Sequence, residues 1–464
     1  MEHQEYSVGL DIGTTKIVAI VGRRNSRGKI EVLGLGKAKS LGVHKGIVNN
    51  ISQTISSIKT AVEEAQKSAG VPIHKVTVGI AGKHIRSLQH SDYIMREHPD
   101  RYITEDDIEK LKDQVKKLVM LPGEEIIHVL PQEYKVDSEG EIQEPVGMHG
   151  KRLEANFHVV VGQMGSIRNI ARCVREAGLE MEALTLEPLA SSEAVLTKEE
   201  KEAGVAIVDI GGGTTDIAIF KDNIIRHTCV IPYGGGIITD DIKEGCSIIE
   251  KHAEQLKVKF GSSVPELEKD STYVTIPGLH GRPDKEISLK VLAQIINARV
   301  EEILEMVNTE LKAYGAFEQK KKLIAGIVLT GGGSNLRNLR QLANYTTGFD
   351  SRIGFANEYV ANDKNQYLKG PEFATSIGLL MESLKIRDKK MLPTEEEIIE
   401  QKKEEGSQKL EVANQKTEVE NHPSSIIEPP AEIAKPKEQA RRSKPTFGQS
   451  LMDKVKKFFE EVEE

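Results

Sequence analysis

The sequence predicts an α/β protein of two domains, and three observations lead to this prediction. At 464 residues the chain is long for a single hydrophobic core. Short apolar strand patterns alternate with amphipathic helix patterns along most of its length. One strand–turn–strand unit also occurs twice, near the N-terminus and again after residue 204, so we expect one copy in each domain.

The composition predicts aliphatic cores and a reducing compartment. Hydrophobic residues make up 38% of the chain, but aromatic residues only 4%, and Trp is absent. The cysteines Cys173, Cys229 and Cys246 form no CxxC pair, and their odd number fits buried thiols without a disulfide framework. The formal net charge of −8 argues against non-specific binding of nucleic acid.

Hydropathy predicts a cytosolic protein, unless another feature holds it to a membrane. The N-terminus from Met1 to Tyr6 is polar and lacks the apolar region of a signal peptide. No apolar run approaches the ~20 residues that a membrane-spanning helix needs.

The first domain begins with strands and continues as α/β. Apolar strands are predicted at 7–10 and 17–22 around a Gly/Thr turn, followed by a β-rich run at 30–35. Residues 50–70 place apolar side chains on one helical face and end at Gly70, a C-cap candidate. A buried strand is predicted at 76–80.

A more polar segment at about 83–164 predicts an α+β subdomain inserted into the first domain. It contains a helix over 104–119, with Thr104 as N-cap and Asp107 three residues later. Strand patterns at 126–130 and 157–161 flank a turn-rich middle.

The rest of the globular chain returns to the α/β pattern. Helices are predicted at 166–177, 237–250, 253–260, 288–314 and 373–384, and strands at 181–186, 205–210, 216–220 and 327–330.

The composition changes after Lys389 and predicts a disordered linker over 389–446. This segment is rich in Lys, Glu, Gln, Ser and Pro, and it cannot bury enough apolar surface to fold. Residues 447–464 regain a helical pattern with one apolar face. That face consists of Leu451, Val455, Phe458, Phe459 and Val462.

The terminal helix is expected to need a partner surface, because an isolated helix of this length is marginal in water. A membrane interface fits the apolar face with its basic neighbours upstream. Docking on a protein is the alternative, and the acidic end at Glu460, Glu461, Glu463 and Glu464 would be repelled by anionic lipid.

The repeated unit has the chemistry of a phosphate-binding loop. Asp11 to Lys16 reads Asp-Ile-Gly-Thr-Thr-Lys, and Asp209 to Asp216 reads Asp-Ile-Gly-Gly-Gly-Thr-Thr-Asp. Glycines bring backbone N–H groups close to phosphate oxygens, and threonine hydroxyls add donors. An Asp at the end of each first strand can hold Mg²⁺ through water. Two such hairpins would grip a triphosphate from both sides.

A third motif, Leu329 to Leu336, runs from an apolar strand into three glycines, and in isolation it would fit any strand-to-helix turn. In this position after two phosphate hairpins, it is typical of a backbone turn beside an adenine ring.

These motifs, in this order, resemble the actin-like ATPase superfamily. The connecting segments at 184–190 and 374–380 complete its pattern. Within the superfamily, Leu186 to Ser191 and Tyr233 to Gly236 resemble the bacterial cell division family FtsA. The insertion at 83–164 also falls where that family carries its own subdomain.

The resemblance implies a domain plan. Domain I would cover 1–195, with the connecting helix 370–388 packing back on it, and domain II would cover 196–369, with an outer subdomain at about 236–310. The tail would end in an amphipathic membrane-targeting helix.

The resemblance also implies a site for ATP and Mg²⁺. Asp11 and Asp209 would position Mg²⁺ through water, and Glu187 would orient a water in an ATPase that is slow at most. Glu187 could instead be a helix-capping or salt-bridging carboxylate. The residues implied to contact nucleotide are Asp11, Gly13, Thr14, Thr15, Lys16, Asp209, Gly211, Gly212, Gly213, Thr214, Thr215, Gly235, Glu254, Lys257, Gly332, Gly333 and Asn335.

The implied function is that of a peripheral protein on the cytoplasmic face of the cell membrane at the division septum. Such a protein polymerises, tethers FtsZ polymers to the membrane and recruits later division proteins. Basic residues in the outer subdomain would bind the acidic FtsZ tail, namely Arg282, Lys285, Lys290 and Arg299. An actin-fold kinase or a chaperone-type ATPase is the alternative. A kinase would need a catalytic Asp in a sugar pocket, and a chaperone a substrate domain after the ATPase.

Overall fold

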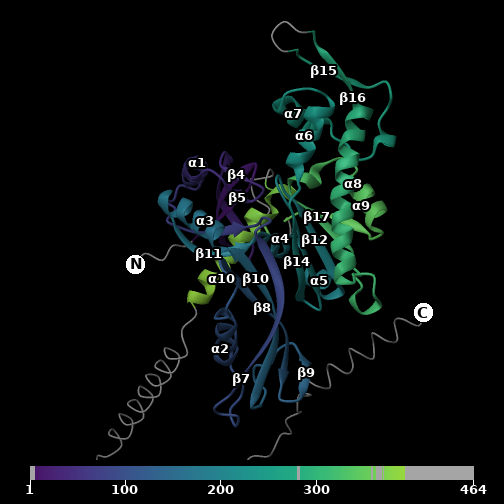
Figure 1. Ribbon diagram of the computed structural model, residues 1–464. Helices are drawn as coiled ribbons and strands as arrows, with labels where there is room; N and C mark the ends of the chain where they lie inside the picture. Colours follow the sequence, from purple (N-terminus) through teal and green to yellow (C-terminus); the bar gives the residue numbers. More distant parts are fainter. Residues whose placement is uncertain (1–5, 279–282, 357–358, 362–367, 369, 392–464) are drawn as a thin grey trace, which may run out of the picture. The chain divides into compact units, whose positions relative to one another are not determined.

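The computed structural model describes residues 6–278, 283–356, 359–361, 368 and 370–391 (Figure 1). The predicted amphipathic helix at 447–464 and nearly all of the predicted linker lie outside the described residues. The description below concerns the unit that ends at Leu392.

The first sheet contains the first copy of the repeated unit. Its strands are β1 (Ser7–Ile12), β2 (Lys16–Arg24), β3 (Ile30–Lys39), β6 (Lys75–Ile80) and β11 (Glu180–Leu186). They lie in the order β11-β6-β1-β2-β3, and β1 pairs antiparallel with β2 and parallel with β6. Every residue of β1 is buried, as expected for a central strand covered on both faces.

A second sheet of the same topology contains the second copy. Its strands are β12 (Val205–Ile210), β13 (Thr215–Lys221), β14 (Ile224–Ile231), β17 (Ile327–Thr330) and β18 (Ser351–Ile353). Their order is β14-β13-β12-β17-β18, and β12 pairs antiparallel with β13 and parallel with β17. Strand directions therefore match those of the first sheet read from β3 to β11. The sequence repeat is a structural repeat.

Helices cover both faces of the first sheet. The helices are α1 (Ile51–Ala69), α3 (Met164–Glu176), α4 (Glu187–Val195) and α10 (Ala374–Met391). Side chains of α1 and α3 share one hydrophobic cluster with β1, whereas α4 and α10 share another with strands of both sheets. The predicted C-cap of α1 is confirmed, because Gly70 is left-handed with φ 70°. The structure adds an N-cap, Asn50, which accepts a hydrogen bond from the Gln53 N–H.

Close packing of α10 on α4 depends on a glycine. A Cβ built on Gly378 would lie 2.9 Å from the Cα of Ala190, so any side chain there would separate the helices. This crossing holds α4 next to the ends of β1 and β12, where the candidate site lies.

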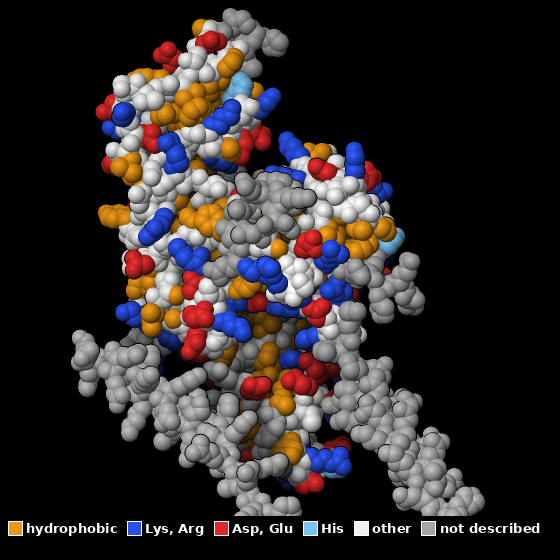
Figure 2. Space-filling view, turned by 180° about the vertical axis from the view of Figure 1, so that it is seen from behind, with side chains coloured by type: hydrophobic (Ala, Val, Ile, Leu, Met, Phe, Trp, Pro, Cys, Tyr) orange, Lys and Arg blue, Asp and Glu red, His pale blue; other side chains and the backbone are white. Residues whose placement is uncertain are grey.

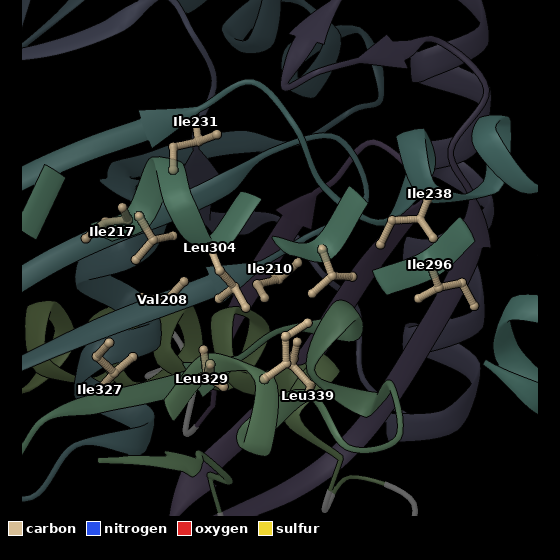
Figure 3. Packing of buried hydrophobic residues seen from close by; sticks show 14 of the residues in the cluster. Val208, Ile210, Ile217, Ile231, Ile238, Ile296, Leu304, Ile327, Leu329 and Leu339 are labelled. Carbon is tan, nitrogen blue, oxygen red and sulfur yellow. The ribbon is translucent and has the colours of Figure 1, made fainter. Parts of the chain in front are cut away.

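The second sheet has its own aliphatic core. Its helices are α5 (Lys198–Ala203), α6 (Gly235–Gly245), α7 (Glu250–Phe260), α8 (Leu289–Tyr314) and α9 (Leu339–Thr347). Ile296 and Leu304 of α8 pack with strand residues such as Val208 and Leu329, as Figure 3 shows. A short hairpin of β15 (Tyr273–Ile276) and β16 (Lys285–Ser288) precedes α8.

The predicted insertion forms a separate antiparallel sheet. It contains β7 (Ile85–Met95), α2 (Glu105–Lys116), β8 (Glu124–Val136), β9 (Glu139–Ile142) and β10 (Arg152–Gln163). Leu111 of α2 packs against β10 residues such as Phe157. Thr104 and Asp107 form the expected capping box at the start of α2.

Some elements differ from the sequence prediction. The helix predicted at 237–250 ends at Gly245, and the helix predicted at 253–260, α7, already begins at Glu250. Strands β7 and β14 were not predicted, because both have many partly exposed polar residues instead of an apolar run. A two-stranded hairpin of β4 (Val43–His44) and β5 (Ile47–Val48) was also missed.

Candidate nucleotide site

The first loop joins β1 to β2 and carries a buried carboxylate at its start. The Ser376 hydroxyl donates to Asp11 Oδ2 at 3.1 Å. Burial raises the pKa of Asp11, and Lys16 works against that rise. Lys16 Nζ donates to the Glu372 carbonyl at 2.5 Å and lies 4.7 Å from the centre of the Phe373 ring. The loop is therefore held by α10 and the turn before it.

The second loop joins β12 to β13 and is held in the same way. Asp209 Oδ2 accepts hydrogen bonds from Ser191 Oγ at 2.6 Å and Thr375 Oγ1 at 3.0 Å. Burial raises the pKa of Asp209. Thr214 Oγ1 donates to Asp216 Oδ2 at 2.9 Å. Each aspartate at a strand end is thus oriented by hydroxyl donors from α4 or α10.

The two loops lie in contact with each other. A Cβ built on Gly212 would lie 2.8 Å from Thr15 Oγ1, and one built on Gly213 would lie 2.5 Å from Thr14 Oγ1. Only glycine therefore lets the loops approach this closely. Both loops line one cavity of about 90 Å³, together with Glu187, Gly331, Glu372 and Thr375.

Besides Glu372, four buried carboxylates line this cavity, and burial raises the pKa of each of them. They are Asp11, Glu187, Asp209 and Asp216. The pKa of Glu187 lies well above its usual value, first because of burial and then because of the other three carboxylates. Burial and Asp209 raise the pKa of Asp216 to about 8. Among the residues that the structure describes, Lys16 is the one basic side chain in the lining.

This arrangement fits a hydrated cation. Asp216 Oδ1 is buried and has no hydrogen-bond partner, so it needs either a proton or a cation. No group of three or more His, Cys, Asp or Glu side chains among the described residues is arranged to hold a metal directly. Mg²⁺ held through waters and phosphate oxygens matches both observations.

A second cavity of about 210 Å³ adjoins the loops and is lined mainly by residues of the second loop, α6, α7 and the 332–336 turn. Lys257 Nζ donates to the Gly235 carbonyl and to Thr239 Oγ1, each at 2.7 Å, and pairs with Glu254 at 2.7 Å. Asn335 Nδ2 donates to Glu372 Oε2 at 3.0 Å. Val258 and Leu336 add apolar surface of the kind that a nucleobase needs.

The structure brings nearly all the predicted site residues to these two cavities. Thr215 is the exception: it lines neither cavity, and its hydroxyl donates to the Tyr233 carbonyl at 2.8 Å. Sequence reasoning missed Asp216, although the repeat itself carried a signal. Asp216 occupies the place of Lys16 in the second copy, a charged residue at the start of an apolar strand.

No helix among the described residues is long and apolar enough to cross a bilayer.

Two family models match the chain. The model of cell division protein FtsA matches residues 206–378, and the model of the SHS2 domain inserted in FtsA matches residues 82–161. The FtsA of Pseudomonas aeruginosa is 40% identical over 378 residues, which cover 81% of this chain and 89% of that protein. The chain belongs to the FtsA family. The FtsA of Neisseria meningitidis is 37% identical, covering 87% of this chain and 96% of that protein.

A solved structure shares the fold of this FtsA-family chain. The PilM–PilN type IV pilus biogenesis complex matches with a TM-score of 0.60 at 16% identity, covering 82% of this chain and 98% of that one. The sheet formed by β7 to β10 is the SHS2 subdomain of the family, so the predicted fold class and the inserted subdomain are confirmed.

Proposed function

We propose that this FtsA-family chain binds Mg-ATP between its two loops and tethers FtsZ polymers to the membrane at the division site. One observation carries the nucleotide part: two loops from topologically matched sheets contact each other and line one cavity. Family membership supports the division role.

Each side of the site has a distinct role in this proposal. Asp11 and Asp209, fixed by their hydroxyl donors, hold Mg²⁺ through water. Lys16 and the backbone N–H groups of the glycine loops bind phosphate oxygens. Mg²⁺, when bound, neutralises the phosphate charge and the carboxylates around it.

Glu187 is proposed to orient a hydrolytic water. As the first residue of α4 it lies near Gly79 and lines the cavity with the three aspartates. Burial and the neighbouring carboxylates raise the pKa of Glu187, which favours its protonated form, and a bound cation would lower that pKa. A base whose protonated form is favoured fits slow turnover at most.

Membrane attachment is assigned to residues 447–464. The apolar face of Leu451, Val455, Phe458, Phe459 and Val462 would enter the interface, on the cytoplasmic side of the membrane. Single copies would bind reversibly, so filaments of many copies would be needed for stable attachment. We propose that copies of the chain associate through the inserted subdomain. We also propose that domain I covers 1–195 and domain II covers 196–369.

The FtsZ tail is proposed to bind the outer part of the second domain. Lys290 pairs with Asp270 at 2.6 Å, and Arg299 makes a two-point contact with Asp241 and also pairs with Glu302. Lys285 donates to the Cys246 carbonyl, and Arg282 lies outside the described residues. The predicted cations are thus partly neutralised, and an acidic peptide would have to displace Asp270 to reach Lys290. On the face drawn in Figure 2, acidic and basic side chains are likewise interspersed.

The test is recruitment of FtsZ to anionic vesicles by the full chain with Mg-ATP, measured by co-sedimentation. The chain is expected to bring FtsZ into the pellet, and Phe458→Glu is expected to abolish this. Ser450→Glu adds the same charge off the apolar face and should preserve recruitment. If Phe458→Glu recruits FtsZ as well as the unchanged chain does, the tethering proposal fails.

A further inference from the structure

The β4–β5 hairpin contains an unfavourable residue at its turn. Its two turn residues are Lys45 and Gly46, with φ values of 49° and 74°. A two-residue turn with both φ values positive favours Asn-Gly, because Asn tolerates the left-handed region and Lys does not. Lys45 therefore occupies a strained position for which the turn itself gives no reason.

The turn lies against both loops of the nucleotide site. The Gly46 N–H donates to Thr14 Oγ1 of the first loop at 3.2 Å. A Cβ built on Gly213 of the second loop would lie 2.9 Å from the Cα of Lys45. Gly46 also lines the cavity that both loops share. The hairpin thus presents a lysine at the point where the loops meet.

The Lys45 ammonium group has no carboxylate partner among the described residues. It lies instead 5.0 Å from the centre of the Tyr233 ring. Tyr233 belongs to the other half of the site: its carbonyl accepts from Thr215, and it precedes the glycines that begin α6. A cation over a partly exposed ring is held weakly, so a stronger anion nearby would displace it.

We propose that Lys45 is a phosphate-sensing residue. Its ammonium group moves away from the Tyr233 ring and binds the terminal phosphate of a nucleoside triphosphate. The proposal rests on the proposed nucleotide site and specifies how that site distinguishes triphosphate from diphosphate. The backbone of Lys45 touches the second loop, so the long flexible side chain of Lys45 reaches the end of a phosphate chain held between the loops. A diphosphate ends one group earlier and leaves the lysine on the ring.

The test compares affinities of the full chain for Mg-ADP and for a non-hydrolysable Mg-ATP analogue by calorimetry. Lys45→Met is expected to weaken analogue binding at least tenfold and to change ADP binding less than twofold. Lys45→Asn should give the same selective loss with an unchanged or higher Tm, because Asn suits the turn. Lys67→Met removes an exposed lysine of α1 and should change neither affinity.

The outcomes distinguish failure of the sensing role from failure of the proposed nucleotide site on which it rests. If the unchanged chain binds neither nucleotide, the proposed site itself is wrong, and the sensing role falls with it. If the unchanged chain binds both, and the Lys45 variants lose ADP and analogue equally or lose neither, the site stands and the sensing role is wrong. The Tm of Lys45→Asn shows that a loss does not come from misfolding.

Discussion

Replacing Asp216 by Asn should stabilise the ligand-free chain at pH 8. Asp216 is 3% exposed, lines the cavity together with Asp209 and Glu187, and has one carboxylate oxygen without a partner. Its pKa rises from 3.8 to about 8 in the folded chain. A carboxyl group whose pKa is raised by folding adds stability below pH 3.8 and loses it as the pH rises toward 8. The ligand-free chain should therefore lose stability between these pH values.

The size of the effect follows from the shift. At ~1.4 kcal/mol per pKa unit, the full shift of Asp216 sets a ceiling of about 6 kcal/mol. Asp11, Asp209 and Glu187 compete for protons in the same cavity, and Lys16 offsets part of the repulsion. We therefore expect Asp216→Asn to remove on the order of 2 kcal/mol of the destabilisation at pH 8, less the cost of placing an amide there.

Thermal unfolding followed by circular dichroism from pH 5 to 9 measures this, since the chain has no Trp for fluorescence. The unchanged chain should lose Tm between pH 5 and 8, and Asp216→Asn should lose less. Asp100→Asn, at an exposed position, is the control and should follow the unchanged chain. If the Tm of Asp216→Asn falls with pH as steeply as the Tm of the unchanged chain, the reasoning about buried carboxylates is refuted.

Four further changes test other parts of the account. Gly212→Val places a branched side chain on Thr15 and should weaken Mg-ATP binding at least tenfold, about 1.4 kcal/mol, in calorimetry; unchanged affinity would mean that the loops need not touch. Gly378→Leu should lower the free energy of unfolding by about 2 kcal/mol or more, because α10 must move off α4; an unchanged Tm would contradict the close crossing. Lys290→Glu should weaken binding of an FtsZ tail peptide in fluorescence anisotropy, whereas equal affinity would place the peptide elsewhere. Replacing Glu460 and Glu461 by Gln should increase pelleting with anionic vesicles, and no increase would show that the acidic end does not limit attachment.

The sequence predicted the fold well where residue types follow a strong local rule. The Asp-Gly-Thr repeat, the Gly70 cap and the capping box at Thr104 each specify backbone geometry, and the structure has them where expected. Strand β14 could not be found in this way. It is an edge strand with polar residues on both faces, and apart from its hairpin partner β13 it contacts the inserted subdomain, which is distant in sequence.

In the candidate site, too, residues of a local motif could be predicted, whereas residues whose role depends on tertiary packing could not. Asp11 and Asp209 were predicted from the motif, but the hydroxyls that orient them come from Ser191, Thr375 and Ser376. These three residues lie in the connecting segments that carry the resemblance to the family, but no local rule assigns them this role, because it arises only when α4 and α10 pack together. Lys45 was missed for a related reason: its hairpin is short, and its importance comes from contact with two loops distant in sequence.

The central claim is that both loops bind one Mg-nucleotide, and calorimetry with a non-hydrolysable Mg-ATP analogue tests it most directly. The full chain should bind one equivalent, and Asp11→Ala and Asp209→Ala should each lower the affinity at least tenfold, about 1.4 kcal/mol. Asp100→Ala should leave it unchanged. Binding that survives in either Asp11→Ala or Asp209→Ala at full strength would contradict a site shared by the two loops.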